Sequence, residues 1–132
     1  GFEVDVYTSN EAVGVQAEYI RDGLDYEYWF ANVRKLLDSG RIRAVHCMCT
    51  INALCLDTLP RLLDLLNKLK QVYGKEQISF TLNILRFPSF QSALVLPDNL
   101  RNNYRLQLQE LLGLLHVKFC ANQVQQFLEK YF

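Results

Sequence analysis

The sequence lacks an excess of charge of either sign, since 14 lysines and arginines balance 14 aspartates and glutamates in 132 residues. This balance gives no electrostatic reason to expect nucleic acid or an anionic membrane surface as a partner. The sequence also lacks an apolar run of roughly 18 residues, the usual minimum for a membrane-spanning helix, and no signal peptide is visible at Gly1. We therefore expect a cytoplasmic protein whose partners include neither nucleic acid nor a membrane.

Cysteines are also few, and they stand at positions 47, 49, 55 and 120. A structural zinc site usually needs two cysteines on a turn, with two to four residues between them, together with a second pair of ligands. We expect Cys47 and Cys49 to lie on opposite faces of one strand, and all four cysteines to be small buried residues without disulfides. The spacing therefore assigns no metal ligand.

The residues that are present indicate a folded α/β domain. Hydrophobic residues make up 50% of the chain and aromatic residues 12%, which is typical of a folded protein. Strand patterns at residues 2–8, 44–51 and 78–85 alternate with helical patterns at residues 25–40, 57–73, 98–115 and 117–132. This order predicts parallel strands with right-handed crossovers. The middle strand is almost continuously apolar, so we expect helices to cover both of its faces.

The spacing of the strands predicts part of a larger barrel. Each strand and its helix take about 35 to 40 residues, so eight such units would need roughly 280 residues, close to the size of a TIM-type barrel. We expect residues 1–97 to form the three-stranded part of an open TIM-like (β/α) barrel within a longer chain. Residues 98–132 are expected to pack on it as a C-terminal helical extension. The alternative is a complete small sandwich of three strands and their helices.

Local patterns predict further details of the helices and loops. We expect Asp57 to be the N-cap of the second helix. The buried stripe of that helix is expected to contain Leu59, Leu62, Leu63, Leu66, Leu69 and Val72. The connections at residues 9–23 and 86–97 are long, which is typical of functional loops. In the second loop, Phe87 and Phe90 are expected to pack beside the prolines.

Three stretches of the chain occur in an informative order. They are Val-Tyr-Thr-Ser-Asn-Glu-Ala-Val-Gly at residues 6–14, Ala-Glu-Tyr-Ile-Arg-Asp-Gly-Leu-Asp-Tyr-Glu-Tyr-Trp-Phe-Ala-Asn-Val at residues 17–33, and Val-His-Cys-Met-Cys-Thr-Ile-Asn-Ala-Leu at residues 45–54. Together they resemble the latter half of the radical S-adenosylmethionine (SAM) enzymes, nearest to the twitch-domain-containing proteins. In that family the fourth strand ends in a Ser-x-[Asp/Glu]-like motif, the next loop carries Tyr-x-Arg-x-Gly, and the fifth strand ends in Thr-x-Asn or a relative.

The cluster-binding motif of that family is absent from this chain. Its CxxxCxxC supplies three thiolates that hold a four-iron four-sulfur (4Fe–4S) cluster, and none of the four cysteines here maps onto it. The resemblance therefore implies the SAM-binding half of a radical SAM enzyme, with the cluster only in the complete protein. Radical chemistry by these residues alone is not expected.

The resemblance and the charges together place the amino acid end of SAM near residues 9–23, in the connection that follows the first strand. Arg21 is expected to pair bidentately with the carboxylate of SAM, a task that suits its planar fork. Ser9 is expected to donate to the same carboxylate, and Glu11 to accept from the ammonium or a ribose hydroxyl. In the alternative interpretation, Arg21 forms a solvated pair with Asp22, and residues 9–11 serve turn and capping chemistry.

The same hypothesis places the ribose and adenine of SAM at the ends of the second and third strands. Asn52, with Thr50 beside it, is expected to hydrogen bond to the ribose or the adenine edge. Leu85 is expected to pack on adenine. Alternatively, Asn52 only ends the strand or caps the next helix.

Partners and rival functions follow from the same patterns. We expect an exposed apolar sheet edge and inner face that pair with the missing N-terminal half or with a second copy, and a peptide or small molecule as substrate. A rival hypothesis is a non-catalytic interaction module whose C-terminal helices cover a partner with leucines 106, 108, 111, 112, 114 and 115. A conventional hydrolase is not indicated, because no Ser-His-Asp set stands out. His46 is expected to be a hydrogen-bonded core or interface residue.

Overall fold

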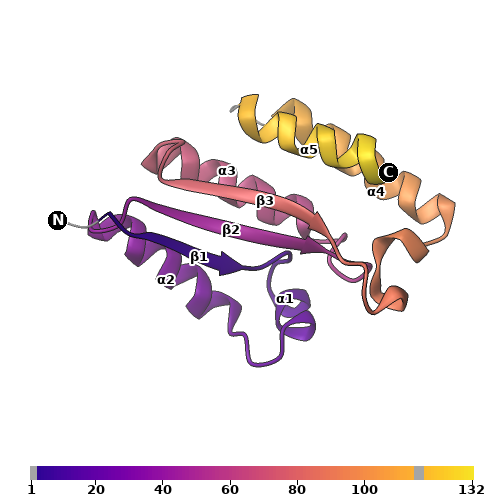
Figure 1. Cartoon of the computed structure of the whole chain (residues 1–132), viewed down its shortest axis with the longest axis horizontal. Coiled ribbons are helices and arrows are strands. Elements are labelled where there is room, and N and C mark those ends of the chain that lie inside the picture. The colour runs from indigo at the N-terminus through magenta and orange to yellow at the C-terminus, as the bar shows by residue number, and fades with distance from the viewer. Residues whose placement is uncertain (1–2, 115–117) are drawn as a thin grey trace.

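A parallel sheet of three strands forms the centre of the fold. The computed structural model describes residues 3–114 and 118–132, without the side chains of residues 112–122. The elements follow one another in the order β1 (Asp5–Ser9), α1 (Val15–Ile20), α2 (Tyr26–Ser39), β2 (Ala44–Ile51), α3 (Leu59–Tyr73), β3 (Ile78–Ile84), η1 (Ser89–Gln91), η2 (Ala93–Val95), α4 (Asp98–Leu114) and α5 (Lys118–Tyr131). The strands lie in the order β1-β2-β3, and both neighbouring pairs are parallel (Figure 1). The predicted α/β class and parallel strand order are therefore confirmed, in an open sheet.

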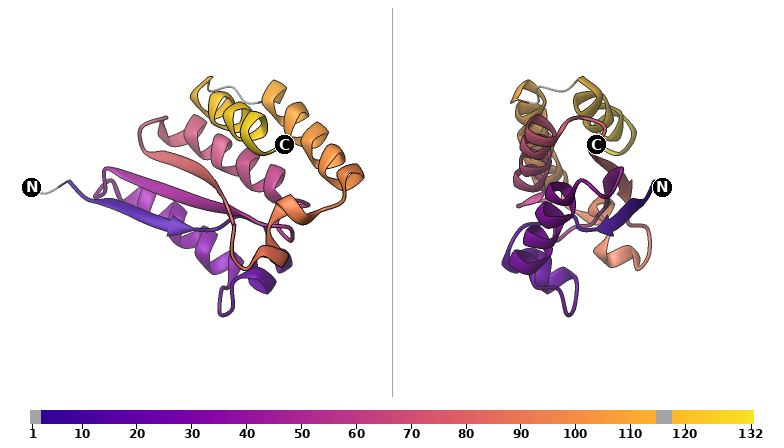
Figure 2. Two further views of the ribbon diagram at one scale, coloured as in Figure 1. Left: turned by 45° about the vertical axis from the view of Figure 1, so that its right-hand side comes forward. Right: turned by 90° about the vertical axis from the view of Figure 1, so that its left-hand side faces the viewer.

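Helices α2 and α3 cover one face of the sheet, whereas on the other face α5 lies only against the β3 margin. Figures 1 and 2 show α2 and α3 on the same side of the sheet. The opposite side, which we call the open face, is formed by Asp5, Tyr7 and Ser9 of β1, His46, Met48 and Thr50 of β2, and Ser79, Thr81 and Asn83 of β3. The expectation of helices on both faces of β2 is therefore wrong. The expected apolar inner face is also wrong, because most of these side chains are polar.

The covered face holds the buried cysteines. Cys47 and Cys49 are both buried on β2, and Cys55 is buried just beyond it. Residues two apart on a strand point to the same side. The expectation that Cys47 and Cys49 lie on opposite faces is therefore wrong. The side chain of Cys120 lies outside the described residues.

Helix α2 begins and ends as its sequence predicts. The side chain of Asp25 accepts a hydrogen bond of 3.0 Å from the backbone N–H of Tyr28, which is a typical N-cap. Gly40 ends the helix with a φ of 66°, a conformation that glycine adopts readily. Trp29 is partly buried against the core, and its indole N–H donates to Thr8 Oγ1 at 2.7 Å. This bond ties α2 to β1.

Helix α3 ends at Tyr73, as predicted, but differs from its prediction at the N-cap and at the last residue of its buried stripe. Its N-cap is Thr58 rather than Asp57, and the carboxylate of Asp57 accepts a hydrogen bond from the Gln16 side chain at 3.2 Å instead. The predicted leucine stripe is buried, as Leu59, Leu62, Leu63, Leu66 and Leu69. Val72, predicted to belong to it, is exposed in the last turn. The stripe therefore ends one turn earlier than its spacing suggests.

The expected loop at residues 9–23 contains a short helix. Helix α1 spans Val15–Ile20, and its Ala17 is completely buried. The backbone N–H of Val13 donates to Thr58 Oγ1 at 3.0 Å, so this segment is fastened to the start of α3. The segment is therefore more ordered than a fifteen-residue loop.

The C-terminal helices pack on the sheet and on α3. Helix α4 contacts α3, and α5 contacts both α4 and β3. Figure 1 places α5 beside the free edge of β3. Leu108 and Leu111 are buried, whereas Leu106 is exposed. The side chains of Leu112, Leu114 and Leu115 lie outside the described residues.

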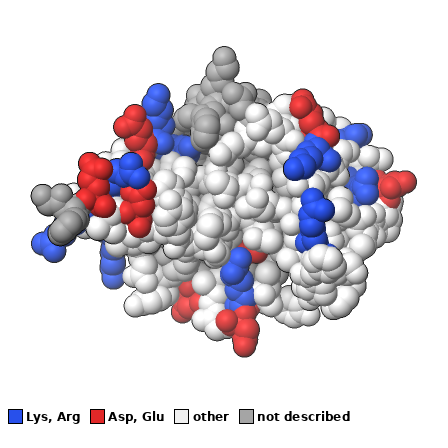
Figure 3. Space-filling model, in the orientation of Figure 1, with Lys and Arg blue, Asp and Glu red and all other residues white. Residues whose placement is uncertain are grey.

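Charged side chains are mixed in sign over the surface. Figure 3 views the open face and shows lysine, arginine, aspartate and glutamate toward its rim, with few charges across its middle. Within residues 3–114 and 118–132, no helix is both long enough and apolar enough to cross a membrane.

Candidate functional site

The carboxyl ends of the three strands meet at one edge of the sheet. The register pairs Ser9 with Met48 and Ile51 with Ile84, so residues that follow each strand come close together. All three arrowheads point the same way in Figure 1. The prediction that Ser9, Asn52 and Leu85 lie at one end of the sheet is confirmed. In open parallel sheets, ligands bind in the crevice at this end.

A cleft of about 480 Å³ opens at this end. It is lined by Glu11, Tyr19, Ile20, Arg21, Thr50, Asn52, Leu54, Leu85 and Gln91. Five of the six predicted site residues therefore line one cavity, and Ser9 is the one that does not. The volume falls within the range of about 300–1,000 Å³ found for small-molecule sites. Below, this cavity is called the carboxyl-end cleft.

An ion pair forms the polar floor of the cleft. Arg21 Nε and Nη2 donate to the two carboxylate oxygens of Glu11 at 2.7 and 3.0 Å. The Glu11 side chain is 3% exposed and the Arg21 side chain 33% exposed, so the pair is open to solvent on the arginine side. Arg21 follows α1 directly as its C-cap, and its backbone N–H donates to Ala17 at 2.9 Å. The helix end thus sets the position of the guanidinium.

This pairing changes the role predicted for Arg21. The alternative of a solvated pair with Asp22 is wrong, because Glu11 is the partner. The fork expected to hold a ligand carboxylate already holds that of Glu11. The cleft therefore presents a neutral pair with one positive and one negative group.

The side chain of Asn10 stabilises the turn between β1 and Glu11. Asn10 is completely buried, and its backbone N–H extends the β1–β2 ladder by donating to Met48 at 3.1 Å. Its side-chain oxygen accepts from the backbone N–H of Ala12 at 3.2 Å. This turn directs Glu11 toward Arg21.

Asn52 shapes the turn that follows β2. Its Nδ2 donates to the carbonyl of Thr50 at 3.2 Å, and its Oδ1 accepts from the backbone N–H of Leu54 at 2.9 Å. The alternative interpretation, in which Asn52 ends the strand, therefore describes these contacts. Asn52 also lines the cleft, so any ligand contact would come in addition to its local bonds.

The sequence analysis did not predict that the loop after β3 contributes Gln91 to the cleft. The carbonyl of Gln91 accepts from the backbone N–H of Ala53 at 2.7 Å, which joins the loop after β3 to the loop after β2. This bond holds the loop after β3 at the cleft, whose lining includes both Gln91 and Asn52. A polar residue inside a loop bounded by Pro88 and Pro97 is the only signal that could have indicated it.

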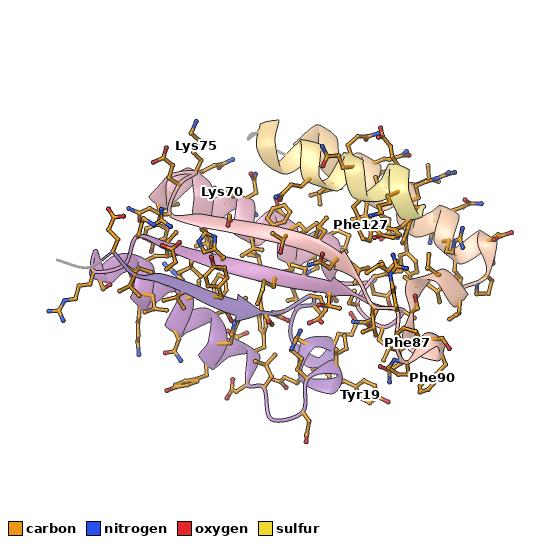
Figure 4. The ribbon with its side chains drawn as sticks, viewed as in Figure 1. Tyr19, Lys70, Lys75, Phe87, Phe90 and Phe127 are labelled. Carbon is orange, nitrogen blue, oxygen red and sulfur yellow. The ribbon has the colours of Figure 1, made fainter. Side chains whose placement is uncertain are left out.

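Three exposed aromatic rings lie at the end of the molecule where the cleft opens. Phe87 is 83% exposed and Phe90 is 74% exposed, although they were expected to pack within their loop. Tyr19, which lines the cleft, is also largely exposed. Figure 4 shows the three rings at the same end of the molecule. The packing expectation is wrong, and large exposed apolar groups of this kind often mark a binding surface.

The described thiols are poorly suited to bind metal. Burial raises the pKa of Cys55 to about 12, and a hydrogen bond with Cys47 together with burial raises the pKa of Cys49. Thiolates, which are the metal-binding form, are therefore disfavoured. In the part of the chain that the structure describes, no group of three histidine, cysteine, aspartate or glutamate residues is placed to hold a metal ion.

No family model, no curated protein and no solved structure matches the chain.

Proposed function

We propose that this chain is the SAM-binding half of a radical SAM-type protein. The observation that carries the proposal is that Glu11, Arg21, Thr50 and Asn52, singled out from motifs, and Leu85, singled out as a strand end, line one cleft at the carboxyl ends of parallel strands. These residues come from three separate parts of the sequence. Their convergence on a cavity of suitable volume supports a shared ligand.

The chemistry of the cleft complements that of SAM. The amino acid end of SAM carries a carboxylate and an ammonium, and the floor of the cleft carries Arg21 and Glu11 side by side. The carboxylate would lie near the exposed side of Arg21, and the ammonium near Glu11. Asn52 and Gln91 provide amide groups for the ribose and adenine edges, and Leu85 provides an apolar wall.

The iron-sulfur cluster does not belong to the described part of this chain. Cys47 and Cys49 lie buried on the covered face of the sheet and Cys55 is buried just beyond β2, and burial raises the pKa of Cys49 and Cys55. They do not fit a cluster that must face SAM at the carboxyl-end cleft. We assign the cluster to the complete protein and derive no radical step from these residues.

In this proposal, a further β/α segment completes a TIM-like barrel. Strand β1 is an edge strand, and no helix of residues 3–114 and 118–132 packs on the open face beside it. Parallel sheets are usually covered on both faces, so this arrangement favours a further β/α segment that pairs with β1. That segment is the N-terminal half of the same protein or, in its absence, a second copy.

The substrate would reach the cleft past the exposed aromatic rings. Phe87 and Phe90 offer apolar contact area that the isolated chain leaves in water. A peptide side chain or an apolar small molecule suits such a rim. The rival function, a module that binds partners through its C-terminal leucines, has less support, because Leu108 and Leu111 are already buried within the fold.

Titration of SAM into the chain tests the proposal. Calorimetry or ligand-observed NMR should show weak binding, with a Kd on the order of hundreds of micromolar, because the cluster contact to SAM is absent. Arg21→Lys keeps the charge but loses the planar fork, and should weaken binding about tenfold, equivalent to about 1.4 kcal/mol. Arg41→Lys is the matched control, because Arg41 is exposed and far from the cleft lining.

Two results would contradict the proposal. Equal binding by wild type and Arg21→Lys would remove Arg21 from the site. Absence of SAM binding by the complete protein with its cluster reconstituted would refute the SAM assignment.

A further inference from the structure

A second polar group lies at the opposite end of the open face. Strand β2 places His46 beside Ser79 of β3, its register partner. His46 Nδ1 lies 2.6 Å from Ser79 Oγ, and His46 Nε2 lies 3.1 Å from Asp5 Oδ2 of β1. A serine, a histidine and an aspartate are thus linked in one hydrogen-bonded row across three strands. Their sequence positions, 5, 46 and 79, gave no sign of this contact because it depends on register.

The hydrogen bonds of the row define its proton positions. Arg43 donates to both carboxylate oxygens of Asp5. Hydrogen bonds from Arg43 and then His46 lower the pKa of Asp5 to about 2, so its carboxylate is ionised at neutral pH and only accepts. His46 Nε2 must therefore carry the proton. In the neutral imidazole, Nδ1 then has a free lone pair, which accepts the hydroxyl proton of Ser79.

The imidazole is held in place and remains reachable. The ring of Tyr7 stacks on His46 with their centroids 4.7 Å apart. A cleft of about 410 Å³ opens beside His46, between Arg43, Ala44, Glu76 and Gln77. The His46 side chain is partly exposed, so a small molecule can approach the row from solvent.

We infer that Ser79 is a base-activated nucleophile that accepts an acyl group from small activated esters, with His46 as its general base. Asp5 orients His46 and stabilises the imidazolium as a positioning residue. The roles match those of a Ser-His-Asp triad, which is recognised by geometry rather than by sequence order. The imidazole is turned over relative to the common arrangement, with Nδ1 rather than Nε2 toward serine. This site is independent of the SAM site, which lies at the other end of the sheet.

The transfer balances without a further reactant. Ser79 Oγ forms a bond to the ester carbonyl carbon while its proton moves to His46 Nδ1. The carbon–oxygen bond to the leaving group then breaks, and the leaving oxygen takes the proton from Nδ1. An acyl-serine and an alcohol result. Water can repeat the sequence, which releases the carboxylic acid and restores Ser79.

The second half of this cycle should be slow. The central strand β2 pairs with a neighbour on each side, so its backbone N–H groups are committed to the sheet. N–H donors aimed at the developing oxyanion each contribute about 10²- to 10³-fold in rate, so both acylation and deacylation lack this help. Acylation by an activated ester is still the faster step, because its leaving group departs far more readily than the serine alkoxide does when water attacks the acyl-serine. An acyl-serine should therefore accumulate rather than turn over rapidly.

Acetylation by p-nitrophenyl acetate tests the inference on the whole chain. Wild type should release one equivalent of nitrophenol in a burst and gain the mass of one acetyl group, mapped to Ser79 by peptide fragmentation. Ser79→Ala should abolish the burst. His46→Gln should slow it about 100-fold or more, the usual contribution of a general base. Thr81→Ala is the matched control on the same face of β3 and should acylate as wild type does.

A second test uses the wild-type protein alone, so it does not require any variant to fold. Ser39 is an exposed serine whose hydroxyl donates to the carbonyl of Leu36 at 2.6 Å. Selective acetylation of Ser79 over Ser39 is expected in the native protein and should disappear in urea. Equal acetylation of both serines in the native protein would overturn the inference, as would an undiminished burst in folded His46→Gln.

Discussion

Each end of the open face has a carboxylate held by an arginine fork, but the two pairs lie in different surroundings. At the carboxyl end, Glu11 is 3% exposed and Arg21 33% exposed. At the amino end, Asp5 is 15% exposed and Arg43 59% exposed. Loop residues form the first pair, whereas Asp5 belongs to β1 and Arg43 stands just before β2. The carboxylate is therefore fully buried at one end and partly hydrated at the other, where its arginine is mostly exposed.

The difference teaches that geometry alone does not set the contribution of an ion pair. A buried carboxylate that loses its partner cannot regain water, so breaking the pair is strongly destabilising. A carboxylate near water regains most of its solvation, and exposed pairs contribute little. We therefore expect the carboxyl-end pair to matter for stability, and the amino-end pair to matter mainly for the orientation of His46.

The largest effect should come from removing Arg21. Arg21→Ala leaves the Glu11 carboxylate buried and unpaired, so the free energy of unfolding should fall by about 3 kcal/mol. Arg43→Ala is the matched variant at the amino end and should cost far less. Urea unfolding followed by circular dichroism measures both. Equal losses in the two variants would show that the two ends do not differ as described.

A double variant sharpens the same comparison. Glu11→Leu together with Arg21→Met removes both charges and retains apolar volume. Replacing a buried pair in this way is often neutral. The double variant should therefore be more stable than Arg21→Ala alone, and a further loss would assign the contribution to the pair itself.

An intermediate effect is expected from acid at the amino end. The pKa of Asp5 is lowered from 3.8 to about 2 in the folded protein. A lowered folded pKa means that the stabilisation is complete above the unfolded value and is lost as pH falls from about 4 to about 2. Asp5→Asn should remove this part of the pH dependence. Thermal unfolding of both proteins between pH 2 and pH 5, in steps of about half a unit, measures the difference; parallel curves would contradict the Asp5 contribution.

The smallest effect should come from the aromatic rim of the carboxyl-end cleft. Phe87 and Phe90 are mostly exposed, so Phe87→Ser and Phe90→Ser should change the free energy of unfolding by less than about 0.5 kcal/mol. Phe80→Ser is the contrasting variant, because Phe80 is completely buried on β3. Unfolding in urea separates them. A large loss at Phe87 or Phe90 would indicate that the loop depends on these rings for packing.

The sequence predicted the elements that have a clear period. The leucines of α3 recur at helical spacing, and the apolar residues of β2 are bounded by Gly40 and Asp57, so both elements could be placed within a few residues. Helix α1 was missed because six residues are too few to show a period. Val72 was misplaced because the spacing of a stripe does not reveal where the neighbouring layer ends.

The site could be predicted only in part, since contacts between distant residues do not appear in a sequence. Strand ends and motif residues located Arg21 and Asn52, because parallel strands bring their carboxyl ends together. The pairing of Arg21 with Glu11 depends on the turn at Asn10, which has no distinctive pattern. The contact between His46 and Ser79 depends on strand register, and a shift by one residue would turn the side chains to opposite faces.

Helix α5 lies beside the free edge of β3, and this makes the growth of the sheet self-limiting. An uncovered edge strand is a template for another chain, and a sheet with two such edges can extend without end. Among the described residues, β1 is the one strand with an uncovered edge (Figure 1). Two copies joined through β1 would carry α5 at both outer margins, so the assembly would close as a dimer. The sheet can therefore pair with a second copy through β1, but α5 at the other edge prevents it from extending into a polymer.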